Sequence, residues 1–187
     1  MVEAVIDHLL DLNEVLVQLV QQQRITQEAA DQCLAARRGH TATLNLHPLE
    51  YIATLQPGDL SRPGRTLDLE TLTLWLADWA QQPYLRIDPL KIDVAAVTPL
   101  MSYAFAQRHK ILAVATDSSC VTIASAQPFM RSWESNLAHT LRRPIKRVVA
   151  NPADIQRFTT EFYRLARSVS GASAGDQFVS GVGNFEQ

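Results

Sequence analysis

Apolar residues recur at spacings of three and four over residues 2–22. This is the period of an α-helix, so the pattern predicts helical structure there, with Asn13 as the cap of a second helix that starts within it. Thr26 is the expected N-cap of a further helix over residues 27–38. Residues 1–39 are therefore predicted to form a small, all-helical N-terminal subdomain.

Proline and glycine cluster over residues 40–65, where they mark turns on both sides of a short helix near residues 49–55. This stretch is predicted to be a connector. A helix over about 66–81 is expected to follow, because Leu72 and Trp75 belong to one broad apolar face.

Beyond Pro83 the pattern changes to short strands that alternate with helices. The predicted strands are residues 84–87, 110–116, 121–126 and 145–149. The predicted helices are about residues 99–108, 130–142 and 152–167. The fold class is therefore α+β: the helical subdomain is followed by an α/β-layered domain over residues 66–167, with a sheet of about three strands covered by helices. The tail, residues 168–187, is rich in glycine and serine and is predicted to be a flexible linker.

The composition is that of a folded chain, since 47% of the 187 residues are hydrophobic and 19% are charged. The formal net charge of −2 argues against a broadly cationic nucleic-acid-binding protein. No apolar run approaches the roughly 18 residues of a membrane-spanning helix, so no direct membrane insertion is expected. The two cysteines lie far apart, which fits reduced thiols and a cytoplasmic location.

The sequence offers no catalytic, cofactor-binding or metal-binding constellation. The glycines of residues 171–183 have no lysine among them, so they cannot form the phosphate-binding P-loop G-x-x-x-x-G-K-[ST]. No histidine lies three or four residues from another, so no metal pair is indicated on a helix. We expect no enzyme activity from this chain, and neither a cofactor nor a metal.

Apolar side chains nearly encircle residues 2–20, which is more than one packed face requires. Such a segment either lies in a core or meets a partner, and both alternatives stay open. The candidate partner-contact residues are Val5, Leu9, Leu12 and Leu16. A second candidate is the basic cluster formed by Arg142, Arg143, Lys146 and Arg147, whose three arginines are the candidate contact residues. This cluster is either a solvated face or a contact for an acidic partner or a phosphate.

Several motifs follow one another in a defined order along the second half of the chain. They are P-Y-L-R-I-D-P-L-K-I-D from residue 83, A-Q-R-H-K-I-L-A-V from residue 106, V-T-I-A-S-A-Q-P from residue 121 and I-K-R-V-V-A followed by N-P-A-D-I from residue 145. From about Leu67 to Tyr163 the series resembles the N-terminal region of the GspE/PilB-type ATPases of type II secretion and type IV pilus assembly. Gln127 departs from the aspartate that is common there, which concerns a turn rather than chemistry.

The resemblance implies a docking and coupling module that is not catalytic itself. Its expected partners are the cytoplasmic domain of an inner-membrane platform protein, similar to GspL, and the C-terminal ATPase domain of the same full-length chain. The linker tail would lead towards that ATPase domain, and the protein would be recruited peripherally to the inner membrane.

Some relatives bind cyclic di-GMP through a pattern that falls on residues 14–37. Here Glu14 stands in place of the arginine, and Gln23 stands in place of a glycine. A carboxylate repels the phosphate that an arginine would hold. Cyclic di-GMP binding by that route is therefore not expected, and a second-messenger sensor is kept as the alternative function.

Overall fold

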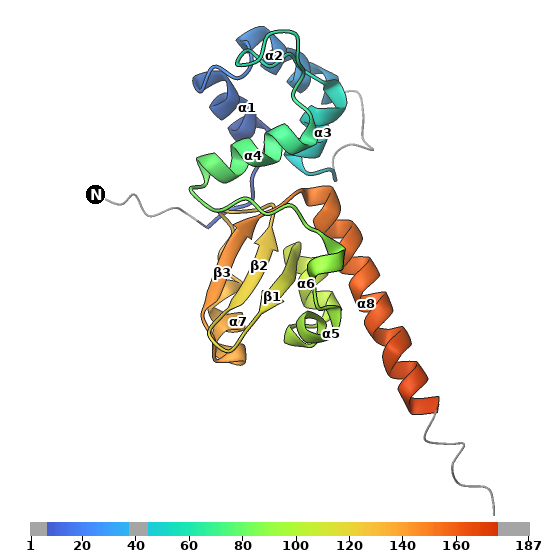
Figure 1. Ribbon diagram of the computed structural model, residues 1–187. Coiled ribbons are helices and arrows are strands. Elements are labelled where there is room, and N and C mark those ends of the chain that lie inside the picture. Colours follow the sequence, from blue (N-terminus) through green and yellow to red (C-terminus); the bar gives the residue numbers. More distant parts are fainter. Residues whose placement is uncertain (1–6, 38–44, 176–187) are drawn as a thin grey trace, which may run out of the picture.

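The computed structural model describes residues 7–37 and 45–175, and it shows a helical layer above a three-stranded sheet that carries its own helices (Figure 1). The helical layer consists of α1 (Leu12–Gln21), α2 (Gln27–Arg37), α3 (Pro48–Leu55) and α4 (Leu69–Trp79). The sheet unit adds α5 (Val94–Val97), α6 (Tyr103–His109), α7 (Glu134–Leu141) and α8 (Pro152–Gly175). Short 3-10 turns, η2 (Pro89–Lys91) and η3 (Thr98–Leu100), lie before and after α5.

The N-terminal helix begins later than the apolar pattern suggests. Asp11 caps α1, because its carboxylate accepts a hydrogen bond from the Glu14 amide at 2.9 Å, so the predicted cap at Asn13 is wrong. Residues 7–10 are not helical. The next helix begins as expected, since the Thr26 hydroxyl accepts from the Ala29 amide at 3.1 Å.

The sheet has the order β1-β2-β3 and mixes strand directions. The predicted hairpin is confirmed: β1 (Ile111–Thr116) pairs antiparallel with β2 (Val121–Ser125). The third predicted strand is also confirmed, and β3 (Ile145–Val149) runs parallel to β2 because α7 carries the chain back across the sheet.

The strand predicted at residues 84–87 is reduced to an isolated bridge. Tyr84 pairs with Val149 at the end of β3, and the Leu85 amide donates to the Val149 carbonyl at 2.8 Å. The segment then turns away, because Asp88 and Pro89 start η2. It covers only the last part of the β3 edge.

Two further element boundaries differ from the predictions. Pro99 lies in η3, and α6 begins after Ser102, whose hydroxyl accepts from the Phe105 amide at 3.2 Å. Helix α8 continues past the predicted end at Arg167, so the predicted linker is wrong for residues 168–175. Residues 176–187 lie outside the described part of the chain.

Three groups of buried side chains form the core. Residues on β1 alternate between two of them: Leu112 and Val114 pack against Phe158 of α8, whereas Ile111 and Ala113 share the other group with Trp133 and Leu137. The third group fills the helical layer.

The helical-layer core includes residues that the sequence placed elsewhere. Leu49 and Ile52 of α3 are fully buried in it, although residues 40–65 were predicted as a connector. Leu72 and Leu76 of α4 are also fully buried in it, although that helix was predicted to open the second domain. We therefore propose that the domain boundary follows α4 rather than preceding it.

Candidate binding groove between the two layers

An open cavity of about 490 Å³ lies where the helical layer meets the sheet unit. A second cavity of about 350 Å³ adjoins it. Both are lined by Asn45, Leu46, His47, Lys110 and Gln127. We call the two together the interlayer groove.

His47 is the buried polar side chain at the centre of the groove, with 6% of its surface exposed. Its Nδ1 accepts a hydrogen bond from the Leu49 amide at 3.2 Å and caps α3, while Glu50 accepts from the His47 amide at 3.2 Å. Because Nδ1 is an acceptor, the proton lies on Nε2, which donates to the Ala126 carbonyl at 2.8 Å. His47 thus joins the start of α3 to the end of β2.

Burial lowers the pKa of His47 to about 4. The bond to the Ala126 carbonyl opposes this shift, and the nearby positive charge of Lys110 adds to it. His47 is therefore neutral at pH 7 and acts as a fixed hydrogen-bonding group rather than as a cation.

Residues 9–11 of the N-terminal segment, residues 7–11, make one wall of the groove. The Leu10 amide donates to the Gln127 side-chain oxygen at 2.8 Å, and the buried Gln127 amide donates to the Ser125 hydroxyl at 2.9 Å. Gln127 therefore ties the beginning of the chain to the end of β2. The sequence placed Gln127 in a turn but did not indicate this contact.

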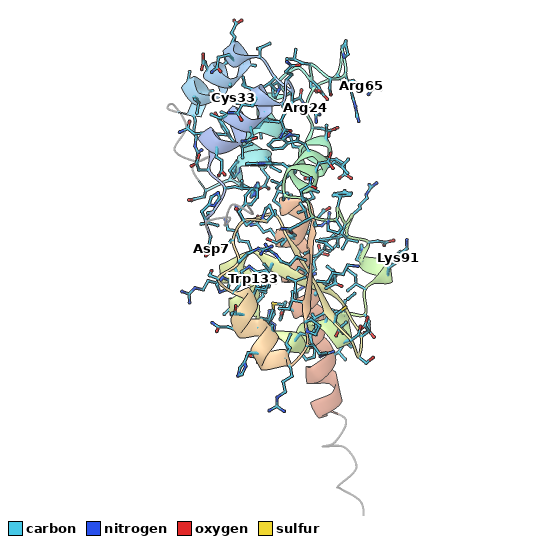
Figure 2. All side chains as sticks on the ribbon, turned by 90° about the vertical axis from the view of Figure 1, so that its left-hand side faces the viewer. Asp7, Arg24, Cys33, Arg65, Lys91 and Trp133 are labelled. Atoms are coloured by element: carbon cyan, nitrogen blue, oxygen red, sulfur yellow. The ribbon has the colours of Figure 1, made fainter. Side chains whose placement is uncertain are left out.

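The same segment is held by the turn that precedes α7. The Asp7 carboxylate accepts from the amides of Arg131 and Ser132, and the bond from Arg131 lowers the pKa of Asp7. The His8 ring stacks on Phe129 with a centroid distance of 5.5 Å. Figure 2 shows Asp7 and Trp133 on the same side of the molecule.

Both signs of charge line the groove. Arg37 and Lys110 supply the cations, and Asp11 and Glu50 supply the anions. This mixture can bind a peptide or a polar ligand, but it lacks the clustered positive charge of a phosphate site. Among residues 7–37 and 45–175, no group of three or more His, Cys, Asp or Glu side chains forms a possible metal site.

The predicted apolar contact residues separate into exposed and buried positions. Leu9 lies on the groove with 54% of its surface exposed. Leu12 and Leu16 are 3% and 2% exposed and belong to the helical-layer core, so they are not available to a partner. Val5 lies outside the described residues. Leu46, 37% exposed, also borders the groove and was missed, because a single leucine in a turn-rich stretch carries no periodic signal.

The predicted basic cluster does not form one surface. Arg147 is buried, donates to the carbonyls of Pro128 at 2.6 Å and Met130 at 3.2 Å, and pairs with Glu134 at 3.5 Å. It supports the turn after β2 rather than facing a partner. Because β3 alternates its side chains, Arg147 points inward while Lys146 is exposed.

The other two arginines of the cluster lie at the end of α7. Arg143 donates from Nη1 to the Thr116 hydroxyl and to the Asp117 carbonyl, both at 2.8 Å, and so holds the β1–β2 hairpin. Arg142 is exposed and ends α7. Of the three predicted arginines, Arg142 is the one with an exposed side chain.

The structure shows the surroundings of Glu14 and Gln23, the two residues that depart from the cyclic di-GMP pattern. Glu14 pairs with the His8 ring at 2.9 Å, so its carboxylate already has a partner within the chain. Gln23 adopts a φ of 54°, the left-handed conformation that favours glycine. The backbone at residue 23 therefore has the left-handed conformation that glycine favours, although the residue is glutamine.

No helix in the described part of the chain has both the length and the apolar character needed to span a membrane.

Comparison with known proteins identifies the class. Residues 80–169 match the MshEN domain, which spans the sheet unit from the end of α4 into α8. The chain also resembles the type IV pilus assembly ATPase TfpB of Acinetobacter baylyi, with 39% identity over 127 residues. That match covers 67% of this chain and 22% of the relative, so the chain corresponds to a small part of the relative's length.

One solved structure shows a similar fold. A structure of MshE with cyclic di-GMP superposes with a TM-score of 0.52 and 17% identity, over 80% of this chain and 98% of that one. The N-terminal domain of XpsE has a TM-score of 0.44 and 12% identity, over 82% and 96% of the two chains. The predicted resemblance is confirmed: residues 80–169 match the MshEN domain, and the chain is similar to an ATPase of type IV pilus assembly.

Proposed function

We propose that this chain is a non-catalytic docking and coupling module that binds the cytoplasmic domain of an inner-membrane platform protein. The observation that carries the proposal is the 39% identity to a type IV pilus assembly ATPase together with the MshEN match. A module of a membrane-associated motor needs a contact that brings it to its site of action. The C-terminal ATPase domain of the full-length chain is the second expected partner.

The interlayer groove is the surface that we assign to platform binding. Two exposed leucines, Leu9 and Leu46, border a cavity wide enough for a partner side chain. Apolar anchors surrounded by charged groups such as Arg37 and Lys110 are typical of protein interfaces. Residues of both layers line the groove, so a bound partner would contact both layers at once.

Calorimetry with the platform protein's cytoplasmic domain from the same organism tests this proposal. Leu9→Ser should weaken binding roughly tenfold, because a buried leucine anchor is worth about 1.5 kcal/mol or more. Leu165→Ser is the matched control, since Leu165 on α8 is 52% exposed and Leu9 is 54% exposed. No detectable binding by the unaltered chain at tens of micromolar would refute platform docking. ATP turnover by this chain would refute its non-catalytic role.

Cyclic di-GMP sensing is the second candidate function, because the similar fold of MshE was solved with that nucleotide. The groove supplies Arg37 and Lys110 but also Asp11, whose carboxylate opposes a phosphate. Titration with cyclic di-GMP, followed by the fluorescence of Trp75 and Trp79, separates the two functions. Binding tighter than about 10 μM, worth about 7 kcal/mol, would favour the sensor.

A further inference from the structure

A compact arm, residues 57–67, extends from the helical layer and ends in a tight turn. The Arg65 amide donates to the Arg62 carbonyl at 3.0 Å, which closes a four-residue turn. Pro63 occupies the second position and Gly64 the third, with a φ of 80°. This is the pattern of a type II turn, in which proline sets the first corner and glycine alone fits the second without strain.

The base of the arm is fixed to the helical layer. Gly58 and Thr66 form an antiparallel bridge, and the Asp59 amide donates to the Arg65 carbonyl at 2.8 Å. The Asp59 carboxylate, 1% exposed, pairs with Arg24 at 3.1 Å. The arm is therefore a rigid support, so little conformational entropy is lost when its tip binds.

The tip presents two arginine side chains to solvent. Residues 60–66 are all exposed, and Figure 2 shows Arg65 projecting away from the helical layer while Arg24 lies beside it. Within the described residues, no ion pair is recorded for Arg62 or Arg65, in contrast to Arg24. Leu60 adds an apolar surface next to them, with 51% of its side chain exposed.

The neighbouring Asp68 shows which chemistry the tip attracts. Asp68 caps α4, and the bond from the Thr71 amide lowers its pKa, with smaller contributions from the charges of Arg62 and Arg65. The positive charges of both guanidinium groups therefore lower the pKa of the Asp68 carboxylate, although no ion pair joins either group to Asp68 in the described part of the chain. Their hydrogen-bond donors stay available.

We propose that the Arg62–Arg65 turn is a docking site for an acidic segment of a protein partner. Each guanidinium group can bind a carboxylate through two parallel hydrogen bonds, and arginine is enriched among residues that dominate interfaces. Leu60 suits an apolar residue beside the acidic ones. This surface is separate from the interlayer groove, so the inference does not depend on the function proposed above.

Protein carboxylates fit the turn better than lipid or nucleic-acid phosphates do. Stable attraction to an anionic membrane requires a cluster of about four to eight basic residues, and nucleic acid requires a basic stripe along several phosphates. The turn offers two cations and has the Asp68 carboxylate beside them.

NMR titration of the complete, isotope-labelled chain with an acetylated hexaglutamate peptide tests the inference. We expect the largest shifts at the amides of residues 62–66. The double variant Arg62→Gln/Arg65→Gln should bind roughly tenfold more weakly, because both bidentate contacts are lost. The matched control is Arg108→Gln/Arg164→Gln, which removes the same charge from two other exposed positions.

A second variant tests the turn itself while keeping both charges. Gly64→Ala has space for its Cβ, since nothing lies within 4 Å, but its φ of 80° is strained for alanine. It should weaken peptide binding several-fold, because the two arginines lose their common orientation.

Three results would overturn the inference. The first is equal weakening by both double variants, which would mean that binding follows net charge. The second is no peptide binding at millimolar concentration. The third is tighter binding, through the same turn, to phosphatidylglycerol vesicles or to single-stranded DNA than to the peptide.

Discussion

Individual residues end several helices of this protein in an unusual way. Among the residues that the structure describes, the non-glycine residues with a positive φ are Gln23, Gln56, Gln81, Lys110 and Arg142. Each lies at or just after the end of a helix, where glycine is the commonest choice. Glutamine, lysine and arginine are good helix formers, so these residue types do not by themselves predict a helix end. Such residues each cost about 1 kcal/mol in the left-handed conformation.

Replacing Gln23 with glycine should stabilise the protein. The substitution removes the strain at a φ of 54°, and the expected gain is roughly 0.5–1 kcal/mol in the free energy of unfolding. Urea denaturation followed by circular dichroism measures it. Gln32→Gly is the control: Gln32 is exposed and lies in the middle of α2, so glycine there should cost about 1 kcal/mol. A gain from both variants, or from neither, would contradict the explanation.

His47 should make stability depend on pH between about 4 and 6.5. Burial lowers its pKa to about 4 in the folded protein, so the unfolded chain binds more protons in this range. Its contribution is complete above pH 6.5 and is lost as the pH falls towards 4, with an upper limit of roughly 3 kcal/mol. Urea denaturation over this pH range measures the loss.

The control for His47 is His47→Asn, which can still cap α3 but has no group that titrates. The difference in unfolding free energy between the two proteins should shrink as the pH falls. Carboxylates such as Asp59 contribute equally to both proteins, so they cancel in the comparison. Parallel curves over the whole range would show that the His47 pKa is not lowered.

At the scale of elements, the arm at residues 57–67 depends on one buried ion pair. Burial would raise the pKa of Asp59, but the hydrogen bonds from Arg24 and Ser61 hold it below its ordinary value. Asp59 is therefore charged. The positive charge of Arg24 offsets the free-energy cost of burying this carboxylate. The arm and the α1–α2 turn are thus one structural unit.

Arg24→Met should destabilise the protein by roughly 3 kcal/mol, because it leaves the Asp59 carboxylate buried without a cation to offset its charge. Thermal and urea denaturation measure this loss. Lys91→Met is the control: its pair with Asp88 is 3.5 Å long, and the lysine side chain is 83% exposed, so a loss below about 1 kcal/mol is expected. Similar losses for the two variants would show that the Arg24 pair is no more than a surface contact.

At the scale of the whole molecule, one side chain belongs to both layers. Val149 is the last residue of β3, yet it is fully buried in the helical-layer core. The Leu10–Gln127 and His47–Ala126 hydrogen bonds cross the same boundary. Packing and hydrogen bonds therefore link the two layers, although the MshEN match begins only at residue 80.

The two layers should unfold in one transition, and Val149→Ala should lower the stability of both by about 2 kcal/mol. Tryptophan variants separate the signals: Trp133→Phe leaves reporters in the helical layer, and Trp75→Phe/Trp79→Phe leaves one in the sheet unit. Urea curves from the two variants should shift together when Val149→Ala is added. A shift seen by one reporter alone would indicate independent domains.

The sequence alone determined the features that depend on neighbours along the chain. The strands at residues 111–116, 121–125 and 145–149, the Thr26 cap and the α+β class follow from local periodicity and turn chemistry. The ordered motifs also indicated the resemblance that the MshEN match and the similarity to a pilus assembly ATPase support.

Only the tertiary structure decided which side chains are buried and which are exposed to solvent. Leu9, Leu12 and Leu16 share one apolar pattern, and only packing against α2, α3 and α4 buries the last two. Arg142 and Arg147 share one basic cluster, and only the turn after β2 buries the second. The groove around His47 joins residues far apart in sequence, so no local pattern could indicate it. Burial depends on contacts between distant segments, and these exist only once the chain has folded.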